Sequence, residues 1–402
     1  MSDVLRISPD EPVGDGRFDR FGLIGWWDQV RLTRARVLVV GAGALGNEIV
    51  KNLALLGVGN LLIADMDRIE NSNLSRSVLY RESDNGQYKS IAAARAARDI
   101  YPDIKAHAFV GNVVHDLGLG AFRWADVVLG GLDNREARLA INRNCWKVNR
   151  PWIDGAIEAI DGSARVFVPD GPCYECTMSQ QDWKLLQTRR SCNLLSLPEM
   201  ERGKTPTTPT VSSIIAGVQC QEAVKLLHGL NTLAGGAWVF NGLTADSYIT
   251  RFQRKADCYS HDKLDDVIAL DGGVADVTAA DLLARAKALL GDDARLEMPR
   301  EMLEKLACPA CKAEEPVFAS LGKVSADKAW CPSCAGVRRE VITFHTIRGD
   351  EPFARRPLEQ IGVPPYDILV ARGHNRSIGF ELSGDAPAVL GPLVSDDALE
   401  FA

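Results

Sequence analysis

The chain has 402 residues, of which 46% are apolar, and its 46 basic and 53 acidic residues give a net charge of −7. This length can bury a full α/β domain and a second, smaller one. No uncharged apolar run is long enough to span a bilayer, residues 1–16 lack the apolar core of a signal peptide, and no basic block stands out. These features exclude membrane-spanning and nucleic-acid-binding proteins, so we expect a cytoplasmic protein with neither a membrane nor a nucleic acid as partner.

Predicted strands and helices alternate through the first half of the chain. After an N-terminal arm, the predicted elements are a short helix (18–32), a strand (37–40), a helix, a strand (61–64), a helix (89–100), a strand (106–110), an apolar strand (126–133), a helix (134–146) and a strand (152–156). This alternation is typical of a doubly wound, largely parallel sheet, which is a Rossmann-like α/β fold.

The second half of the chain breaks this rhythm. Residues 171–210 are predicted to form a long surface loop, with a crossover loop at about 177–210, and an apolar helix follows at 211–230. We expect a boundary near 262, which divides the chain into domains 1–262 and 263–402. The second is predicted to be a smaller α+β domain with a helix (279–290) and strands (339–347, 366–372 and 377–382).

The turn after the first strand predicts a nucleotide site. That strand runs into Gly41, Gly43 and Gly46 and then a helix, while the second strand ends on Asp65. Glycines let the backbone approach a phosphate, a helix N-terminus favours an anion, and the acid can bind a ribose hydroxyl. These residues alone fit NAD as well as ATP.

Four further residues favour a triphosphate over NAD. Arg76, Lys89 and Arg20 are cations expected near the rim of the switch-point crevice, where strand ends converge. Asp133 ends an apolar strand, a position where a carboxylate can hold Mg²⁺ between phosphates. A magnesium ion and several cations absorb the charge that develops when a phosphoryl group is displaced.

Together these motifs resemble one enzyme family over residues 17–262. The chain is similar to ubiquitin-activating enzymes and to the adenylyltransferases of molybdopterin and thiamine biosynthesis. The matching segments, in order, are RFDRF (17–21), GAGALG (41–46), DMDRIENSNLSR (65–76), Lys89 and DNREAR (133–138). Within the last segment, Arg135 and Arg138 are expected on a solvated helix face or paired with neighbours.

The resemblance implies a role for each matching residue. Asp65 would bind the ribose and Asp133 would coordinate Mg²⁺, while Arg20 would reach the γ-phosphate from the other subunit of a homodimer. The remaining implied ATP-binding residues are Gly41, Gly43, Gly46, Asp67, Asn73, Arg76 and Lys89. The implied reaction is adenylation of the C-terminal glycine carboxylate of a ubiquitin-like β-grasp protein, with release of pyrophosphate.

A lone cysteine, Cys192, lies in the expected crossover loop directly after two arginines. Nearby cations lower the pKa of a thiol and raise its thiolate fraction, as a nucleophile requires. The segment after it, residues 209–227, resembles the helix after the catalytic cysteine loop of ubiquitin-activating enzymes, which implies that Cys192 accepts the acyl group as a thioester. The alternative is an exposed thiol without a role. Cys145 and Cys220 are expected to be buried core thiols.

Two C-x-x-C pairs in the second half predict a structural zinc ribbon. Cys308 and Cys311 are separated by 19 residues from Cys331 and Cys334. Four thiolates close a zinc tetrahedron and leave no open position for catalysis. A redox role for either pair is the alternative.

The resemblance implies a second structural zinc site. Its first pair is Cys173 and Cys176, and the family's second C-x-x-C pair appears here as Cys258-x-x-His261. Histidine is an ordinary zinc ligand, so this Cys₃His set is chemically sound although it departs from the family pattern. In the alternative, Cys258 and His261 are linker residues and this site is lost.

The sequence therefore predicts a bacterial activating enzyme for a ubiquitin-like protein, with ATP, Mg²⁺ and two structural Zn²⁺ sites. It would transfer the acyl group to Cys192 and then to a conjugating enzyme. One alternative is a sulfur-carrier adenylyltransferase that stops at the acyl-adenylate. Another is a non-catalytic NAD-binding or zinc scaffold protein.

Overall fold

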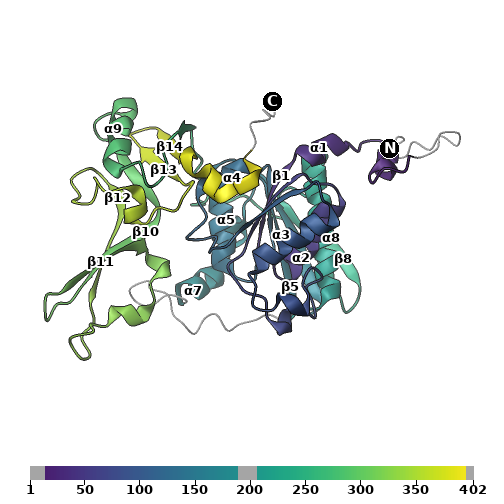
Figure 1. The fold of residues 1–402 in the computed structure, drawn as a ribbon, viewed down its shortest axis with the longest axis horizontal. Coiled ribbons are helices and arrows are strands. Elements are labelled where there is room, and N and C mark those ends of the chain that lie inside the picture. The colour runs from purple at the N-terminus through teal and green to yellow at the C-terminus, as the bar shows by residue number, and fades with distance from the viewer. Residues whose placement is uncertain (1–13, 189–205, 395–402) are drawn as a thin grey trace.

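The computed structural model describes residues 14–188 and 206–394, which form two β-sheets with helices packed around them (Figure 1). The larger sheet has eight strands in the order β3-β2-β1-β4-β5-β6-β7-β8. Its strands are β1 (Arg36–Val40), β2 (Asn60–Ala64), β3 (Lys105–Phe109), β4 (Val127–Gly130), β5 (Trp152–Glu158), β6 (Asp161–Phe167), β7 (Gly236–Asn241) and β8 (Asp246–Arg251).

The parallel half of this sheet confirms the predicted doubly wound fold. Strands β3, β2, β1, β4 and β5 pair in parallel. The chain moves outward from β1 to β3 and then returns to place β4 on the other side of β1, so the switch point lies between β1 and β4. The antiparallel strands β6, β7 and β8 extend the sheet beyond β5, an extension that the alternation of strands and helices did not predict.

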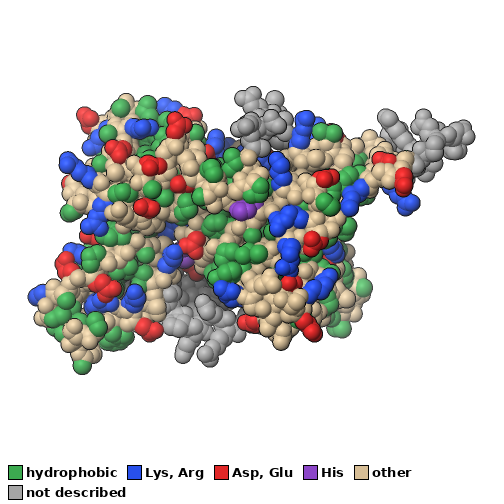
Figure 2. Space-filling model, in the orientation of Figure 1, with side chains coloured by type: hydrophobic (Ala, Val, Ile, Leu, Met, Phe, Trp, Pro, Cys, Tyr) green, Lys and Arg blue, Asp and Glu red, His purple; other side chains and the backbone are tan. Residues whose placement is uncertain are grey.

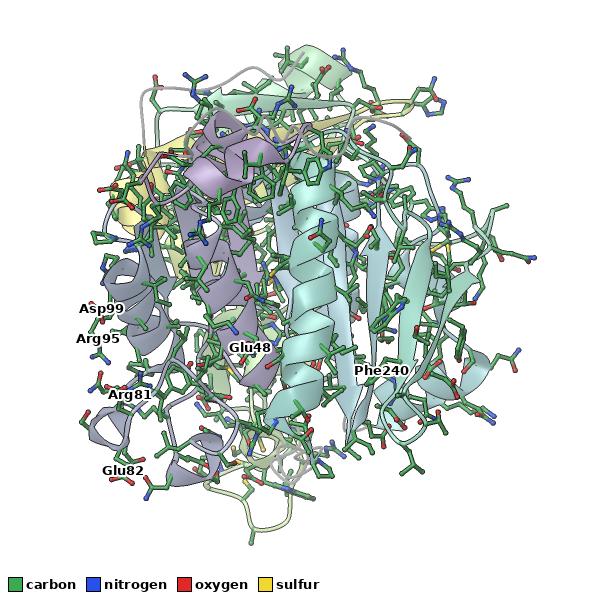
Figure 3. All side chains as sticks on the ribbon, turned by 90° about the vertical axis from the view of Figure 1, so that its right-hand side faces the viewer. Glu48, Arg81, Glu82, Arg95, Asp99 and Phe240 are labelled. Carbon is green, nitrogen blue, oxygen red and sulfur yellow. The ribbon has the colours of Figure 1, made fainter. Side chains whose placement is uncertain are left out.

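The helices cover the two faces of this sheet in separate groups. One face packs against α2 (Ala44–Leu55), α3 (Lys89–Ile100) and α8 (Pro209–Leu227). Figure 3 views this face, with Glu48 of α2 beside the teal helix α8. The other face packs against α4 (Leu119–Trp124) and α5 (Arg135–Lys147).

Strand β1 shows why the central strands are continuously apolar. Val37 and Val39 belong to the core under α2, α3 and α8, whereas Leu38 and Val40 belong to the core under α4 and α5. All four side chains are fully buried. A strand covered on both faces needs apolar residues at every position rather than at alternate ones.

The N-terminal arm and the expected loop at 171–210 differ from the prediction. The expected helix at 18–32 is instead a 3-10 turn, η1 (Asp19–Leu23), followed by α1 (Gln29–Arg34), which Asp28 caps by accepting from Val30 N. The expected loop contains two helices, α6 (Tyr174–Thr177) and α7 (Gln180–Thr188).

The second sheet begins at Asp266, shortly after the predicted boundary at 262. Its strands are β9 (Asp266–Leu270), β10 (Arg295–Ala307), β11 (Glu314–Ser320), β12 (Glu340–Ile347), β13 (Ile368–Arg372) and β14 (Ser377–Leu382). The order is β11-β10-β13-β14-β9, and β12 also pairs with β10. Helix α9 (Ala279–Leu290) packs on this sheet behind a Thr278–Asp281 capping box. The boundary itself stays a prediction.

The final described segment returns to the first sheet. Helix α10 (Ala386–Leu390) and the turn η9 (Gly391–Leu393) pack against β3, and Val389, Leu390 and Leu393 join the apolar core under α4 and α5. The segment covers strands that the six-residue helix α4 does not. The C-terminal part of the chain therefore completes the core of the first sheet.

The distribution of charged and apolar residues in the structure agrees with the absence of basic blocks and long apolar runs in the sequence. Figure 2 shows Lys and Arg side chains interspersed with Asp and Glu on the visible face, without a broad patch of either sign. Within residues 14–188 and 206–394, no helix has both the length and the apolar character needed to cross a bilayer.

Candidate functional site

The glycine turn after β1 is packed so closely that two of its glycines tolerate no side chain. A Cβ on Gly41, whose φ is +90°, would lie 2.5 Å from Gly131 O, and a Cβ on Gly46 would lie 1.9 Å from Gly41 O. At Gly43, the N-cap of α2, a Cβ would meet nothing within 4 Å. The turn is thus fixed on its inner side and open at the N-terminus of a 12-residue helix, where backbone N–H groups can bind phosphate.

Asp65, at the end of β2, is bound to this turn. Its carboxylate accepts hydrogen bonds of 2.7 Å from Ala42 N and from Asp67 N. Burial raises the pKa of Asp65, and the nearby Lys89 ammonium opposes that shift. Lys89 begins α3 and its Nζ lies 2.8 Å from the Asp67 carboxylate. The structure thus brings Asp65, Asp67 and Lys89 together beside the glycine turn.

Asn73 and Arg76 make their recorded contacts within the segment between β2 and α3. Asn73 is buried, and its Oδ1 accepts from Glu70 N at 3.0 Å. Arg76 donates from Nη1 to Ser72 O at 2.7 Å. Their contact with phosphates stays a prediction.

Asp133 lies across the switch point from the glycine turn. The segment after β4 returns to β1 through a 2.9 Å hydrogen bond from Gly131 N to Val40 O. The Asp133 carboxylate is exposed, and its contact with the Asn134 amide is a long 3.4 Å. Its oxygens are available to a hard cation such as Mg²⁺, so the position and the chemistry of the donor fit the predicted metal.

Arg20 lies beside the N-terminal ends of the parallel strands, whereas the crevice lies at their C-terminal ends. Its neighbour Phe18 packs edge-on against Tyr101, with ring centroids 5.4 Å apart, at the end of α3 remote from Lys89. A 12-residue helix is about 18 Å long. This corrects the expectation that Arg20 lies near the crevice rim of its own chain, and a role at the phosphates requires the arm of a second copy.

Several residues that the sequence reasoning passed over hold the glycine turn in place. Asn47 Nδ2 donates to Ala42 O at 2.7 Å, and its Oδ1 accepts from Leu79 N at 2.9 Å. The Tyr80 hydroxyl also donates to Ala42 O, at 2.6 Å. Asn47 is one of four polar residues in α2, so neither it nor Tyr80 carried a local signal for this role.

Both Arg135 and Arg138 pair with neighbours, as one of the two expectations had it, although the Arg135 side chain also stays 43% exposed. Arg135 lies 3.2 Å from the Asp182 carboxylate of α7. Arg138 is buried and bonds to Asp154, a carboxylate with no exposed surface. Arg138 is therefore part of the interior behind the crevice.

Cys192 lies outside the described residues, but both described flanks of its segment belong to the crevice edge of the sheet. On one side, α7 contacts Arg135 at the first turn of α5. On the other, Pro206 O accepts from Ala159 N at the turn between β5 and β6. Cys145 and Cys220 are core thiols as predicted, and burial raises the pKa of Cys220 to about 12.

The four residues of the predicted Cys₃His site lie together. The Sγ atoms of Cys173 and Cys176 are 3.7 Å apart, those of Cys173 and Cys258 are 3.6 Å apart, and His261 Nε2 lies 3.4 Å from Cys176 Sγ. Sulfur ligands around a tetrahedral zinc lie about 3.8 Å apart, given Zn–S bonds of about 2.3 Å. Trp146 stacks on the His261 ring at 4.1 Å and orients it. The chemistry and the spacing of the donors fit zinc.

The predicted zinc ribbon is gathered in the same way at the end of β10. The ligand atoms of Cys308, Cys311, Cys331 and Cys334 all lie within 4.8 Å of one another. Backbone N–H groups of Cys311 and Ala310 lower the pKa of Cys308 to about 6, whereas hydrogen bonding with the Cys311 thiol, followed by burial, raises that of Cys334 to about 12. The number, the chemistry and the close spacing of the four sulfur ligands fit a structural zinc ion.

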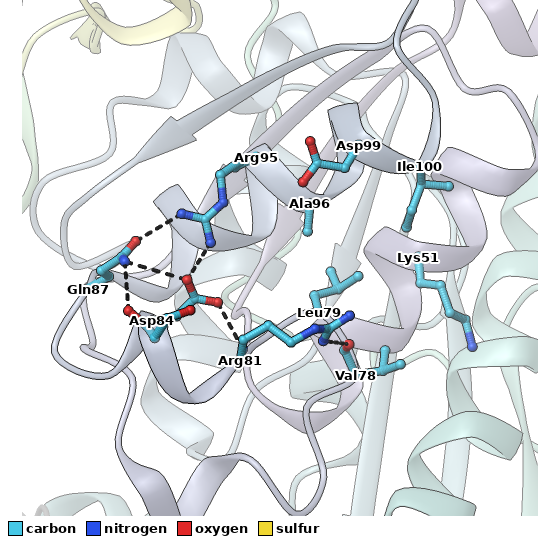
Figure 4. Close-up of a pocket in the computed structure, with 11 residues that line it drawn as sticks. Lys51, Val78, Leu79, Arg81, Asp84, Gln87, Arg95, Ala96, Asp99 and Ile100 are labelled. Carbon is cyan, nitrogen blue, oxygen red and sulfur yellow. Dashed lines mark hydrogen bonds and ion pairs between the residues drawn. The ribbon is translucent and has the colours of Figure 1, made fainter.

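A cavity of about 540 Å³ lies between α2, α3 and the loop that joins β2 to α3 (Figure 4). Asp84 lies on its wall and pairs with Arg95 at 2.5 Å. None of the residues predicted to bind the nucleotide lines this cavity. It is therefore separate from the candidate site at the switch point.

Known proteins resemble this chain over the part that contains the glycine turn, Lys89 and Asp133. Residues 17–260 match the model of the ThiF family. The SAMP-activating enzyme E1 of Haloferax volcanii is 39% identical over 214 residues, which cover 51% of this chain and 71% of that protein. The sulfur carrier protein adenylyltransferase of Thermus thermophilus is 31% identical over 242 residues, covering 58% of this chain and 85% of that protein.

Two further likenesses are also partial. The mouse adenylyltransferase and sulfurtransferase MOCS3 is 31% identical over 255 residues, and the match spans only 53% of its length. The crystal structure of E. coli MccB with ATP shares the fold at a TM-score of 0.52 and 21% identity, covering 62% of this chain and 74% of that one. The family match, which extends over more than half of the residues, confirms the resemblance: the chain belongs to the ThiF family, within the superfamily of ubiquitin-activating-like adenylyltransferases.

Proposed function

We propose that this protein uses Mg·ATP to adenylate the C-terminal glycine carboxylate of a ubiquitin-like or sulfur-carrier protein. The observation that carries the proposal is the convergence of four features at one switch point: an open helix N-terminus, Asp65 bonded to the glycine turn, the Lys89–Asp67 ion pair and the exposed Asp133 carboxylate. Two relatives are named as enzymes that activate or adenylylate such proteins. A carrier carboxylate is the matching nucleophile.

In the proposed reaction, a carboxylate oxygen attacks the α-phosphorus of ATP, the bond to the β-phosphate breaks, and pyrophosphate leaves. Backbone N–H groups of the glycine turn and the Lys89 ammonium would stabilise the phosphates, and Asp65 would orient the ribose. Mg²⁺ held by Asp133 would neutralise charge on the phosphates. The arm of a second copy in a homodimer would supply Arg20.

We further propose that Cys192 takes the acyl group as a thioester, with AMP as leaving group, and passes it to a conjugating enzyme. The support is the position of both described flanks of its segment at the crevice edge. A sulfur-carrier adenylyltransferase that stops at the acyl-adenylate fits the named relatives equally well. The two zinc clusters have closed ligand sets, so both ions would be structural.

The test uses purified protein, ATP, Mg²⁺ and a β-grasp protein ending in glycine from the same organism. Exchange of labelled pyrophosphate into ATP measures adenylation, and non-reducing against reducing gels detect a thioester. Loss of a thiol-sensitive adduct in Cys192→Ala, but not in Cys145→Ala, supports transfer to Cys192. Intact exchange without any adduct supports the sulfur-carrier reaction.

A non-catalytic NAD-binding or zinc scaffold makes the opposite prediction. It would show no pyrophosphate exchange with any β-grasp protein. Substitutions Arg76→Ala and Asp133→Ala would then remove no activity, whereas we expect each to abolish exchange.

A further inference from the structure

The backbone just before Asp133 is held by the buried side chain of Arg138. From α5, Arg138 Nη2 reaches back to Leu132 O at 2.5 Å and to Gly155 O at 3.0 Å, while Nε donates to Asp154 Oδ1 at 3.0 Å. Only 9% of the residue surface is exposed. One planar guanidinium thus ties the end of β4 to β5, next to the residue predicted to bind Mg²⁺.

A second buried side chain holds the same segment from the opposite face of the sheet. Gln219 of α8 is fully buried, and its Nε2 donates to Gly130 O at 2.9 Å and to Ile153 O at 3.3 Å. The carbonyls on both sides of Gly131 are therefore fixed. Asp133 follows this fixed backbone, and within residues 14–188 and 206–394 its exposed carboxylate makes one hydrogen-bond contact, the 3.4 Å contact with the Asn134 amide.

Two arginines, Arg138 and Arg165, pair with Asp154, but they differ in their other contacts. Arg138 also bonds to Leu132 O, whereas the side chain of Arg165 contacts Asp154 and the Tyr174 ring within the part of the chain that the structure describes. Loss of either arginine weakens the ion-pair cluster, but only loss of Arg138 releases Leu132.

We propose that Arg138 is a positioning residue for Asp133, which it acts on through the Leu132 carbonyl. The inference rests on the proposed function, in which Asp133 holds Mg²⁺ on ATP. A carboxylate on a fixed backbone binds a cation without first losing conformational freedom. Groups that orient metal ligands typically contribute about 10–100-fold to metal affinity.

The experiment compares Arg138→Lys with Arg165→Gln. Lysine keeps the charge but is a point donor that cannot hold three acceptors in one plane. The thermal midpoint is measured with ATP over a Mg²⁺ titration, which reports binding without catalysis. We expect the Mg²⁺ concentration for half of the ATP-induced shift to rise about 10-fold or more in Arg138→Lys and to stay at the wild-type value in Arg165→Gln.

A second variant, Arg138→Gln, guards against a failure of the lysine variant to fold. It leaves Asp154 paired with Arg165, so no buried charge is left without a partner. A wild-type Mg²⁺ requirement in both Arg138 variants overturns the inference. An equal rise in the half-maximal Mg²⁺ concentration in all three variants also overturns it, because that would reflect a general loss of order around Asp154. If wild-type protein shows no Mg²⁺-dependent ATP shift, the proposed nucleotide chemistry itself is wrong.

Discussion

The surroundings of Lys89 favour binding of phosphate charge in the proposed site. It begins α3, its Nζ lies 2.8 Å from the Asp67 carboxylate, and only 13% of its side chain is exposed. A partly desolvated ammonium beside the open glycine turn stabilises phosphate charge more strongly than one in water.

We predict that Lys89→Met lowers pyrophosphate exchange by about 10²-fold or more, the usual effect of removing one preorganised charge donor. The matched control is Lys105→Met. Lys105 is the exposed first residue of β3, at the end of the parallel strands remote from the glycine turn. An equal loss in the two variants would show that Lys89 has no particular role. Initial exchange rates at saturating ATP provide the measurement.

The sequence predicted individual roles wherever a residue type points to its chemistry. Gly41, Asp65 and the cysteine clusters belong to this group, because spacing and side chain together restrict what they can do. Arg138 was underestimated because its partners, Asp154 and the Leu132 carbonyl, meet it only after β4 and β5 pair. A side chain that acts through tertiary contacts leaves no local pattern.

At the scale of elements, local signals decided which predictions succeeded. The helix at 279–290 was predicted to the residue, because Thr278 and Asp281 form a capping box before an apolar pattern. Strand β10 was missed because its Glu, Met, Lys and Leu residues favour helix and Pro299 interrupts it. Its ladder with β12 is indeed broken between Glu297 and Met302.

The Cys₃His cluster connects α6, from its N-cap Cys173 to Cys176, with the chain after β8. We predict that Cys258→Ala lowers the thermal midpoint and removes one zinc ion per chain, because the three remaining ligands leave the tetrahedron open. Cys220→Ala is the control, since that thiol is buried outside both clusters.

Zinc content by elemental analysis and thermal unfolding with and without a chelator provide the readout. The chelator should lower the midpoint of wild-type protein more than that of Cys258→Ala, in which only the ribbon cluster responds. An unchanged zinc content in Cys258→Ala would mean that Cys258 and His261 are linker residues.

For the whole molecule, the proposed homodimer, in which Arg20 serves the nucleotide site of the other copy, makes a testable prediction. Within one chain, Arg20 and Asp133 lie at opposite ends of the parallel strands. A chain that lacks Arg20 and a chain that lacks Asp133 should therefore form one intact site when they dimerise. We predict that mixing Arg20→Ala and Asp133→Ala proteins restores up to about a quarter of wild-type exchange. Half of the randomly assorted two-fold dimers are mixed, and each mixed dimer has one intact site.

The complementation experiment requires that subunits exchange, which gentle unfolding and refolding of the mixture ensures. Each variant refolded alone should stay inactive. A mixture as inactive as its components would assign Arg20 a role outside the nucleotide site.

Residues 386–393 have a consequence for how this protein is made. They cover apolar strands of the first sheet, although roughly 280 residues separate them from β3 along the chain. At about 5–20 residues per second, a ribosome needs roughly 14–55 s to synthesise that interval. The nascent first sheet therefore waits for its last covering segment with a hydrophobic face open, which makes it a natural client for a chaperone during translation.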